Sequence, residues 1–196
     1  METLKSKIRK NLGRLGVMII IAGFATFAQN AQAQTAYKVA PGSQIKVNGT
    51  SNIHDWTMAA TGFTCDAQIT EQGQDVSALT FTMPVKNLKG KEDLLNTRAY
   101  KALKADQHNK ITFKLTSATT VPQQKVVKAT GQLTIAGVTK EVPVQVNYSE
   151  SGDEVTFTGA KKIKMSEFKI DPPSFMMGAL KVADEVTINL NLKLKK

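Results

Sequence analysis

The chain has 196 residues, of which 41% are hydrophobic, and its formal net charge is +10. This length suits one domain with a substantial core. The basic residues are scattered rather than gathered in a stripe with interleaved aromatic residues, so the composition does not favour nucleic-acid binding. Cys65 is the only cysteine in the sequence. An intramolecular disulfide is therefore excluded, and packing and backbone hydrogen bonds must hold the fold together.

The N-terminus has the features of a cleavable signal peptide. Five basic residues precede residue 15, an apolar run covers residues 15–28, and Ala31-Gln32-Ala33 is a small-x-small cleavage site. The apolar run is shorter than the roughly 18 residues of a membrane-spanning helix. We predict a signal peptide at residues 1–33, a mature domain at residues 34–196, and no stable membrane anchor after cleavage. Cleavage removes five basic residues and one acidic residue, which lowers the net charge from +10 to +6.

Most of the mature chain alternates apolar and polar residues, a pattern typical of antiparallel strands with one buried face. Eight segments show it, at residues 45–47, 63–69, 79–85, 111–115, 127–135, 142–148, 155–157 and 186–194. Turn signals separate them, at residues 41–43, 71–74, 121–124, 136–137, 151–153 and 171–173. The sequence thus predicts an all-β domain of about eight strands, folded as a closed barrel or a sandwich.

One segment, residues 87–103, lacks this alternation. Its apolar residues have the spacing of one face of a helix instead, and they are Leu94, Leu95, Ala99, Ala102 and Leu103. We predict a short helix beginning near Lys91, because Gly90 disfavours an earlier start. Such an insertion either covers one open end of a barrel or is a plain crossover connection.

Motifs for catalysis or metal binding are missing from the sequence. It contains no HExxH, CxxC or GxSxG motif and no glycine-rich phosphate loop. His54 and His108 are the only histidines, and a metal site needs at least three suitably spaced ligands. Cys65 lies on the apolar face of its segment with no basic neighbour, which favours a buried structural thiol over a nucleophile. We predict no catalytic residue and no metal.

His54, Trp56 and Met58 share one face of a segment in which the inward parity changes from odd, at Ile45 and Val47, to even. This change predicts a bulge or bend near residues 49–52. Two interpretations of His54 remain open. It is either a core histidine packed near Trp56, or a polar group at the mouth of a cavity that orients the head group of a ligand.

Several motifs resemble the YceI-like domain family, whose lipocalin-like barrels are associated with polyisoprenoid binding. Residues 131–142 (GQLTIAGVTKEV) are similar to its GxLTIxGVTKxV hairpin. Residues 96–103 resemble the helical insertion of the family, and residues 108–113 resemble the strand that follows it. His54 matches the family's histidine after the first strand, and residues 184–188 resemble its last strand. The chain departs from the usual pattern at Asp55-Trp56-Thr57 and at residues 172–177.

The resemblance implies an antiparallel lipocalin-like β-barrel of about eight strands with one short helical insertion. It also implies a location in the periplasm and a long isoprenoid or acyl chain inside the barrel. The expected apolar ligand contacts are Trp56, Met58, Phe63, Phe81, Met83, Phe113, Leu115, Leu133, Phe157, Phe175 and Met176. The candidate contacts of a ligand head group are His54, Arg98 and Lys101.

The leading hypothesis is a non-enzymatic periplasmic carrier or sequestering protein for such a lipid, with no cofactor besides a bound isoprenoid or fatty-acid-like molecule. Burial of the lipid removes a cost of about 0.8 kcal/mol per methylene exposed to water. One alternative is a solidly packed accessory barrel that acts through its surface, and another is a lipid-modifying enzyme with His54 as base. Small inward residues favour a void, namely Ala67, Ala129, Gly131 and Gly159. The sequence leaves a homodimer open.

Overall fold

The computed structural model describes residues 34–70 and 75–196. The predicted signal peptide and the predicted turn at residues 71–74 lie outside the described residues. The strands are β1 (Gln34–Val39), β2 (Gln44–Ser51), β3 (Trp56–Ala60), β4 (Thr64–Thr70), β5 (Val76–Pro84), β6 (Leu88–Gly90), β7 (Lys110–Val121), β8 (Val126–Ile135), β9 (Val138–Ser151), β10 (Glu154–Lys164), β11 (Ser174–Phe175) and β12 (Leu180–Lys195). The helix α1 spans Asp93–Ala102, and short 3₁₀ turns cover Val85–Asn87, Pro122–Gln124, Met165–Phe168 and Met176–Gly178.

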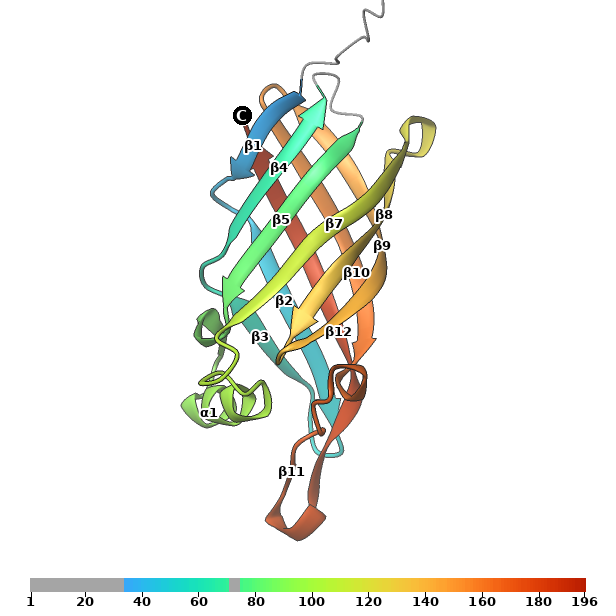
Figure 1. Cartoon of the computed structure of the whole chain (residues 1–196). Coiled ribbons are helices and arrows are strands. Elements are labelled where there is room, and N and C mark those ends of the chain that lie inside the picture. Colours follow the sequence, from blue (N-terminus) through green and yellow to red (C-terminus); the bar gives the residue numbers. More distant parts are fainter. Residues whose placement is uncertain (1–33, 71–74) are drawn as a thin grey trace, which may run out of the picture. The chain divides into compact units, whose positions relative to one another are not determined.

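The strands close into an antiparallel barrel with eight strand positions around its circumference (Figure 1). Five positions are occupied by the single strands β7, β8, β9, β10 and β12. Each of the other three is shared by two short strands: β1 and β2 both pair with β12, β4 pairs with β1 and β3 with β2, and β5 pairs with β4 and β6 with β3. The predicted all-β barrel of about eight strands is confirmed. The sandwich is excluded because β12 pairs with β10 on one side and with β1 and β2 on the other.

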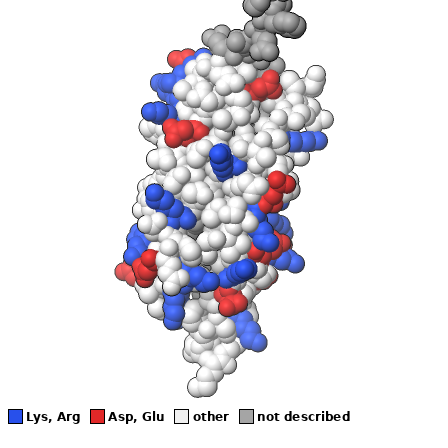
Figure 2. Space-filling model, viewed as in Figure 1, with Lys and Arg blue, Asp and Glu red and all other residues white. Residues whose placement is uncertain are grey.

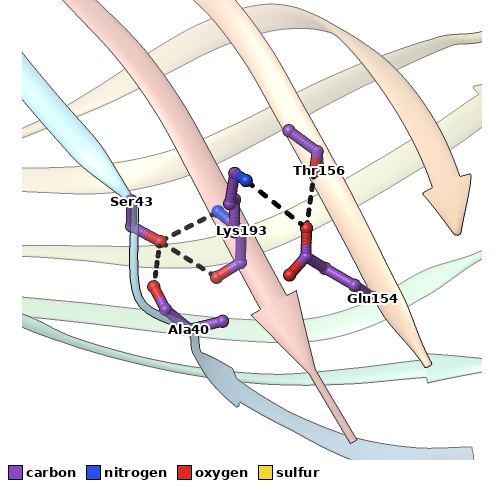
Figure 3. Close-up of polar contacts among 5 residues, drawn as sticks. All are labelled: Ala40, Ser43, Glu154, Thr156 and Lys193. Atoms are coloured by element: carbon purple, nitrogen blue, oxygen red, sulfur yellow. Dashed lines mark hydrogen bonds and ion pairs between the residues drawn. The ribbon is translucent and has the colours of Figure 1, made fainter.

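The seam where the ring closes is held by Ser43, between β1 and β2 (Figure 3). The Ser43 hydroxyl accepts a hydrogen bond from the Lys193 backbone N–H at 3.0 Å. Its proton is donated to the Ala40 carbonyl oxygen at 2.8 Å or to the Lys193 carbonyl oxygen at 3.0 Å. On the other side of β12, the Lys193 Nζ lies 3.7 Å from Glu154 Oε1 of β10. The break between β1 and β2 is therefore tied to β12 by a side chain where the ladder is interrupted.

The turn between β8 and β9 shows why its sequence is a turn signal. Ile135 pairs with Val138, so the loop is only two residues long, and both Ala136 and Gly137 have positive φ, at 48° and 79°. Two-residue hairpins favour this left-handed backbone, which glycine adopts without strain. A Cβ on Gly137 would also clash with the His108 ring, so the position excludes a side chain for a second reason.

The helix α1 begins two residues after the predicted start and lies at the end of the barrel where β12 begins, the lower end in Figure 1. Asn96 is buried and accepts a hydrogen bond from the Gly90 backbone N–H at 2.6 Å. Tyr100 points its hydroxyl at the carbonyl oxygens of Lys86 and Leu88, at 2.9 and 3.0 Å. These contacts fasten α1 to β6, so the insertion covers part of the lower end and is more than a crossover connection.

The change of inward parity after residue 47 is explained by a chain reversal. Of the predicted bulge or bend, the structure has the bend, at Asn52 and Ile53, where β2 and β3 are joined as a hairpin in which Gly49 faces Trp56. The Ser51 hydroxyl donates to the His54 carbonyl oxygen at 2.8 Å and accepts from the His54 backbone N–H at 3.1 Å, which stabilises the turn. An irregularity does occur opposite this hairpin, in β12 between Val182 and Val186.

Two clusters of buried side chains line the barrel, one towards each end. Met58, Val85 and Phe168 belong to the lower cluster, and Ile69 and Leu194 to the upper one. Cys65 of β4 lies in the upper cluster with 1% of its surface exposed, as predicted for a structural thiol. Burial, together with the nearby charge of Asp66, raises the pKa of this thiol to about 12.

Candidate functional site

The barrel encloses a cavity of about 760 Å³. This volume lies within the range of about 300–1,000 Å³ that is typical of small-molecule sites. Its wall is formed by inward-facing side chains of β2, β3, β5, β7, β8, β9, β10 and β12, nearly all of them aliphatic or aromatic. A wall of this kind offers few hydrogen bonds, so it recognises shape and apolar surface.

The cavity is long in the direction of the strands. On β12 its wall runs from Leu180 to Leu192, twelve residues further along the chain. At about 3.3 Å per residue, this stretch measures about 40 Å along the strand. Strands of an eight-stranded barrel tilt by roughly 35–45°, which leaves about 30 Å along the barrel axis. The dimensions suit an extended chain better than a compact molecule.

Nine of the eleven side chains expected to contact an apolar ligand lie on the cavity wall. They are Trp56, Met58, Phe81, Met83, Phe113, Leu115, Leu133, Phe157 and Phe175. Phe63 does not line the cavity and packs behind the wall, with its ring centroid 5.4 Å from that of Phe81. Met176 lies outside the cavity, where 76% of its surface is exposed. The roles of these residues in ligand binding remain predictions.

The three residues predicted to contact a head group are divided by the structure. His54 and Arg98 lie on the cavity wall at the lower end, whereas Lys101 is exposed near the end of α1 and does not reach the wall. His54 is exposed, and its Nδ1 lies 2.9 Å from the carbonyl oxygen of Asp55. The interpretation of His54 as a core histidine is therefore wrong. Its position is that of a polar group at the cavity mouth.

The lower end of the cavity is its mouth. Several wall residues there are exposed to solvent, including His54, Lys91 and Leu94. The Arg98 guanidinium lies 3.8 Å from the centroid of the Phe175 ring, so α1 and β11 meet across this opening in a cation–π contact. Most polar and charged side chains of the wall also gather at this end, namely Ser51, His54, Asp55, Thr57, Lys91, Glu92 and Arg98. Lys161 of β10 is the exception, because it pairs with Ile188, farther along the wall.

Residues 28–194 match the YceI-like domain family. The chain belongs to this family. No helix among the described residues is long and apolar enough to cross a membrane. A comparison with curated proteins found no match. The family resemblance that was based on the hairpin at residues 131–142 and other motifs is therefore confirmed over residues 28–194.

Solved structures share the fold of this YceI-like barrel. BcnA of Burkholderia cenocepacia is 21% identical with a TM-score of 0.67, covering 77% of this chain and 95% of its own. A polyisoprenoid binding domain from Saccharophagus degradans, implicated in plant cell wall breakdown, is 12% identical with a TM-score of 0.64, covering 83% and 99%. The Campylobacter jejuni YCEI protein is 17% identical with a TM-score of 0.61, covering 69% and 82%.

The YceI-like barrel also holds a polar group that alternation and motifs do not single out. The Nε1 of Trp56 is buried and has no hydrogen-bond partner among the described residues, although Trp56 lines the cavity. The indole lies against Gly49, where a Cβ would clash with it. An unmet buried donor costs about 1–3 kcal/mol. A ligand oxygen beside the ring would remove this cost.

Small inward residues account for the void only in part. Ala129 lines the cavity, whereas Ala67, Gly131 and Gly159 do not. A Cβ on Gly131 would clash with the Phe113 ring and lie 2.7 Å from the Lys114 carbonyl oxygen, so a neighbouring side chain already occupies that space. The hollow interior of this YceI-like domain thus depends on the width of the barrel more than on its glycines.

Proposed function

We propose that this chain binds a long apolar lipid, an isoprenoid or acyl chain, inside its barrel and carries or sequesters it in the periplasm without catalysing a reaction. The observation that supports this function is the elongated cavity with an almost entirely apolar wall. Each methylene moved from water into such a wall gains about 0.8 kcal/mol without any directional bond. The wall therefore selects the length and girth of a chain, and the periplasmic location rests on the predicted signal peptide.

The polar end of the cargo lies at the mouth in this proposal. Arg98, His54 and the Trp56 indole all lie on this part of the wall. An oxygen atom of the cargo could accept a hydrogen bond from Trp56 Nε1, which is buried and has no partner among the described residues. Arg98 can bind the same oxygen or a neighbouring one, because its planar group presents several donors. The cargo class is a chain with one oxygen-bearing end.

The two alternatives receive less support from the site. A solidly packed barrel does not agree with a cavity of about 760 Å³. For an enzyme with His54 as base, the imidazole should be oriented by a carboxylate or poised over a nucleophile. Among the described residues, the hydrogen-bond partner of its ring is the backbone carbonyl of Asp55. The site favours binding over proton transfer.

Extraction of the purified protein tests the proposal. The mature domain should be isolated from its native compartment without detergent, analysed by native mass spectrometry, and extracted with organic solvent. We expect a population with a bound mass of a few hundred daltons or more and one class of extractable lipid with a long apolar chain. Delipidated protein should take up the same lipid again. Protein that is unliganded as isolated and takes up no isoprenoid or acyl chain would contradict the proposal.

A further inference from the structure

The large hydrophobic side chains that the described residues expose all gather at the mouth. Ile53 is 62% exposed, Leu94 56%, Met176 76% and Met177 109%. Ile53 lies in the β2–β3 turn, Leu94 on α1, and the two methionines at the tip of the hairpin between β11 and β12, which projects beyond the barrel (Figure 1). We call these four residues the mouth tip. Single exposed hydrophobic residues are common, but four at one end of a molecule mark a contact surface.

The three projections of the mouth tip are tied to one another. The Asn52 side chain donates to the Ala179 carbonyl oxygen and accepts from the Lys181 backbone N–H, both at 2.8 Å, which fixes the β2–β3 turn against the hairpin. Arg98 packs on Phe175 and joins α1 to the same hairpin. Ile53 and the methionines are therefore presented together by a braced structure.

The backbone of the hairpin makes two methionines a costly choice. Met176 and Met177 have φ of 54° and 55°, and Gly178 has φ of 91°. The left-handed conformation costs an L residue with a bulky side chain roughly 1–2 kcal/mol, whereas glycine and asparagine adopt it readily. Both side chains are also exposed, so neither stabilises the core. Folding does not explain methionine at these positions, which indicates a role outside the fold.

Charge is distributed around the mouth tip in a way that suits a lipid surface. Residues 172–180 contain no charged side chain and lie between Asp171 and Lys181. Figure 2 shows the same arrangement, with an uncharged lower tip below a band of basic and acidic side chains. The hairpin part of the mouth tip can enter the boundary between head groups and acyl chains without moving a charge out of water, whereas Ile53 and Leu94, which lie near Asp55 and Asp93, stay at the level of the charged side chains. The basic and acidic side chains of the band above it would then lie at the level of the polar head groups, where both keep their hydration.

We propose that the mouth tip docks into the surface of a lipid bilayer, so that cargo passes between the bilayer and the cavity at the mouth. A bilayer fits better than a protein partner, because the exposed apolar side chains are few and stand on three separate projections rather than forming one contiguous patch. The bilayer is also the medium in which a long apolar lipid is found. This inference rests on the proposed function, since it gives the carrier a place to load.

The order of residues in the hairpin explains how docking serves loading. Phe175 lines the cavity, and its neighbours Met176 and Met177 point away from it into solvent. When the methionines enter the bilayer, the wall residue beside them is brought against the apolar layer. Cargo then moves from one apolar environment to another without exposing its methylenes to water, each of which costs about 0.8 kcal/mol.

Flotation with vesicles of phosphatidylethanolamine and phosphatidylglycerol tests the docking. The variant Met176→Asn/Met177→Gly removes both apolar side chains and introduces residues that tolerate positive φ, so its melting temperature should not fall. We expect the mature wild-type domain to float with the vesicles and the double variant to bind them at least tenfold more weakly. Wild-type protein that does not float, or a double variant that floats equally well, would overturn the inference.

A second pair of variants tests the position of the methionines. Ser151→Met/Asp153→Met places two exposed methionines in the β9–β10 turn, beside the last residue of β12 and so at the other end of the barrel. Loading at the mouth requires the double variant to take up a pyrene-labelled fatty acid from vesicles more slowly than the wild type. When the second pair is added to the double variant, the rate of this transfer should stay low. Restored transfer would contradict loading at the mouth. Flotation requires no cargo, so a protein that floats but holds no lipid would refute the proposed function and leave docking intact.

Discussion

Folding changes the chemistry of the Cys65 thiol. Burial, with a smaller contribution from Asp66, raises the pKa of its thiol from 9.0 to about 12. At pH 8 the folded protein should therefore contain roughly 10³-fold less thiolate at this position than the unfolded chain. We expect iodoacetamide to alkylate the native protein at least 10³-fold more slowly than the protein in urea, as measured by mass spectrometry. Native labelling within tenfold of the denatured rate would contradict a sealed thiol.

The same pKa shift gives a direction for stability against pH. Folding favours the protonated thiol because the folded-state pKa lies above the unfolded one. The stabilisation is complete below pH 9 and is lost as the pH rises through 9 towards 12. A Cys65→Ala variant should lose less stability over this interval than the wild type, which urea unfolding at several pH values can measure.

Trp56 tests the polar part of the proposed site. Trp56→Phe removes a buried Nε1 that has no partner among the described residues, so the unliganded protein loses no internal hydrogen bond. A cargo oxygen bound to that N–H would lose about 1 kcal/mol, or about fivefold in affinity. We expect this loss for palmitic acid or farnesol in calorimetric titrations. Hexadecane, which has no oxygen, should bind both proteins equally, and an equal loss for all three ligands would contradict the hydrogen bond.

Single residues also show how far parity can predict a site. Alternation along β7 assigns Phe113 and Leu115 to the inner face, and both line the cavity. Parity does not report depth, so it cannot show that Phe63 lies behind the wall. It also does not apply to a tight turn, where the left-handed φ of Met176 directs the side chain to solvent. The unmet Nε1 of Trp56 depends on distances between strands, which the sequence does not contain.

At the scale of the elements, one hydroxyl bridges the break in the seam between β1, β2 and β12, beside the Ala40 backbone N–H that donates to the Lys193 carbonyl oxygen at 2.8 Å. Ser43→Ala would leave the Lys193 backbone N–H without the partner that now lies at 3.0 Å. A partly buried unmet donor costs about 1–3 kcal/mol. We expect the free energy of unfolding in urea to fall by about 1–2 kcal/mol, with the exposed Ser149→Ala on β9 as the matched control. An unchanged midpoint for Ser43→Ala would show that water replaces the hydroxyl.

Elements were predictable in proportion to the length of their alternation. The segments at residues 127–135, 142–148 and 186–194 became β8, β9 and β12, whereas the shorter alternation at residues 111–115 and 155–157 indicated only part of β7 and of β10. β3 and β6 are five and three residues long, too short to establish a period. The parity change before Trp56 predicts a bulge or a bend, because both arrangements change the inward parity. Only the pairing of Gly49 with Trp56 distinguishes them.

At the scale of the whole molecule, closure of the sheet was open to two interpretations. Eight one-sided strands can form a sandwich or a barrel, and the difference lies in the contact between the first and last strands of the domain. Here Lys38 of β1 pairs with Lys195 of β12, near the two ends of the described part of the chain. A contact at this separation leaves no local trace in the sequence. The family resemblance supplied what alternation could not.

The hollow interior is the property of the whole barrel on which the proposed function depends, and one strand offers a matched test of it. Ala129 of β8 lines the cavity, while its neighbour Lys128 is exposed on the outer face. Ala129→Phe should fill the part of the cavity farther from the mouth. On β8, Ala129 lies four residues before Leu133 and so nearer the upper end of the barrel, where it pairs with Ala118 and Val144. Lys128→Phe introduces the same side chain on the same strand without reducing the volume.

We therefore expect Ala129→Phe to bind long acyl chains at least tenfold more weakly than the wild type and to retain most of its affinity for short ones, since the mouth and the lower cavity are unchanged. Lys128→Phe should bind both as the wild type does. Titration with fatty acids of 8 to about 20 carbons measures the dependence on length, at about 0.8 kcal/mol for each methylene that the wall accommodates. A uniform loss at every length would indicate a damaged fold, which thermal unfolding would reveal. Unchanged binding of the longest chains would place the cargo outside the barrel.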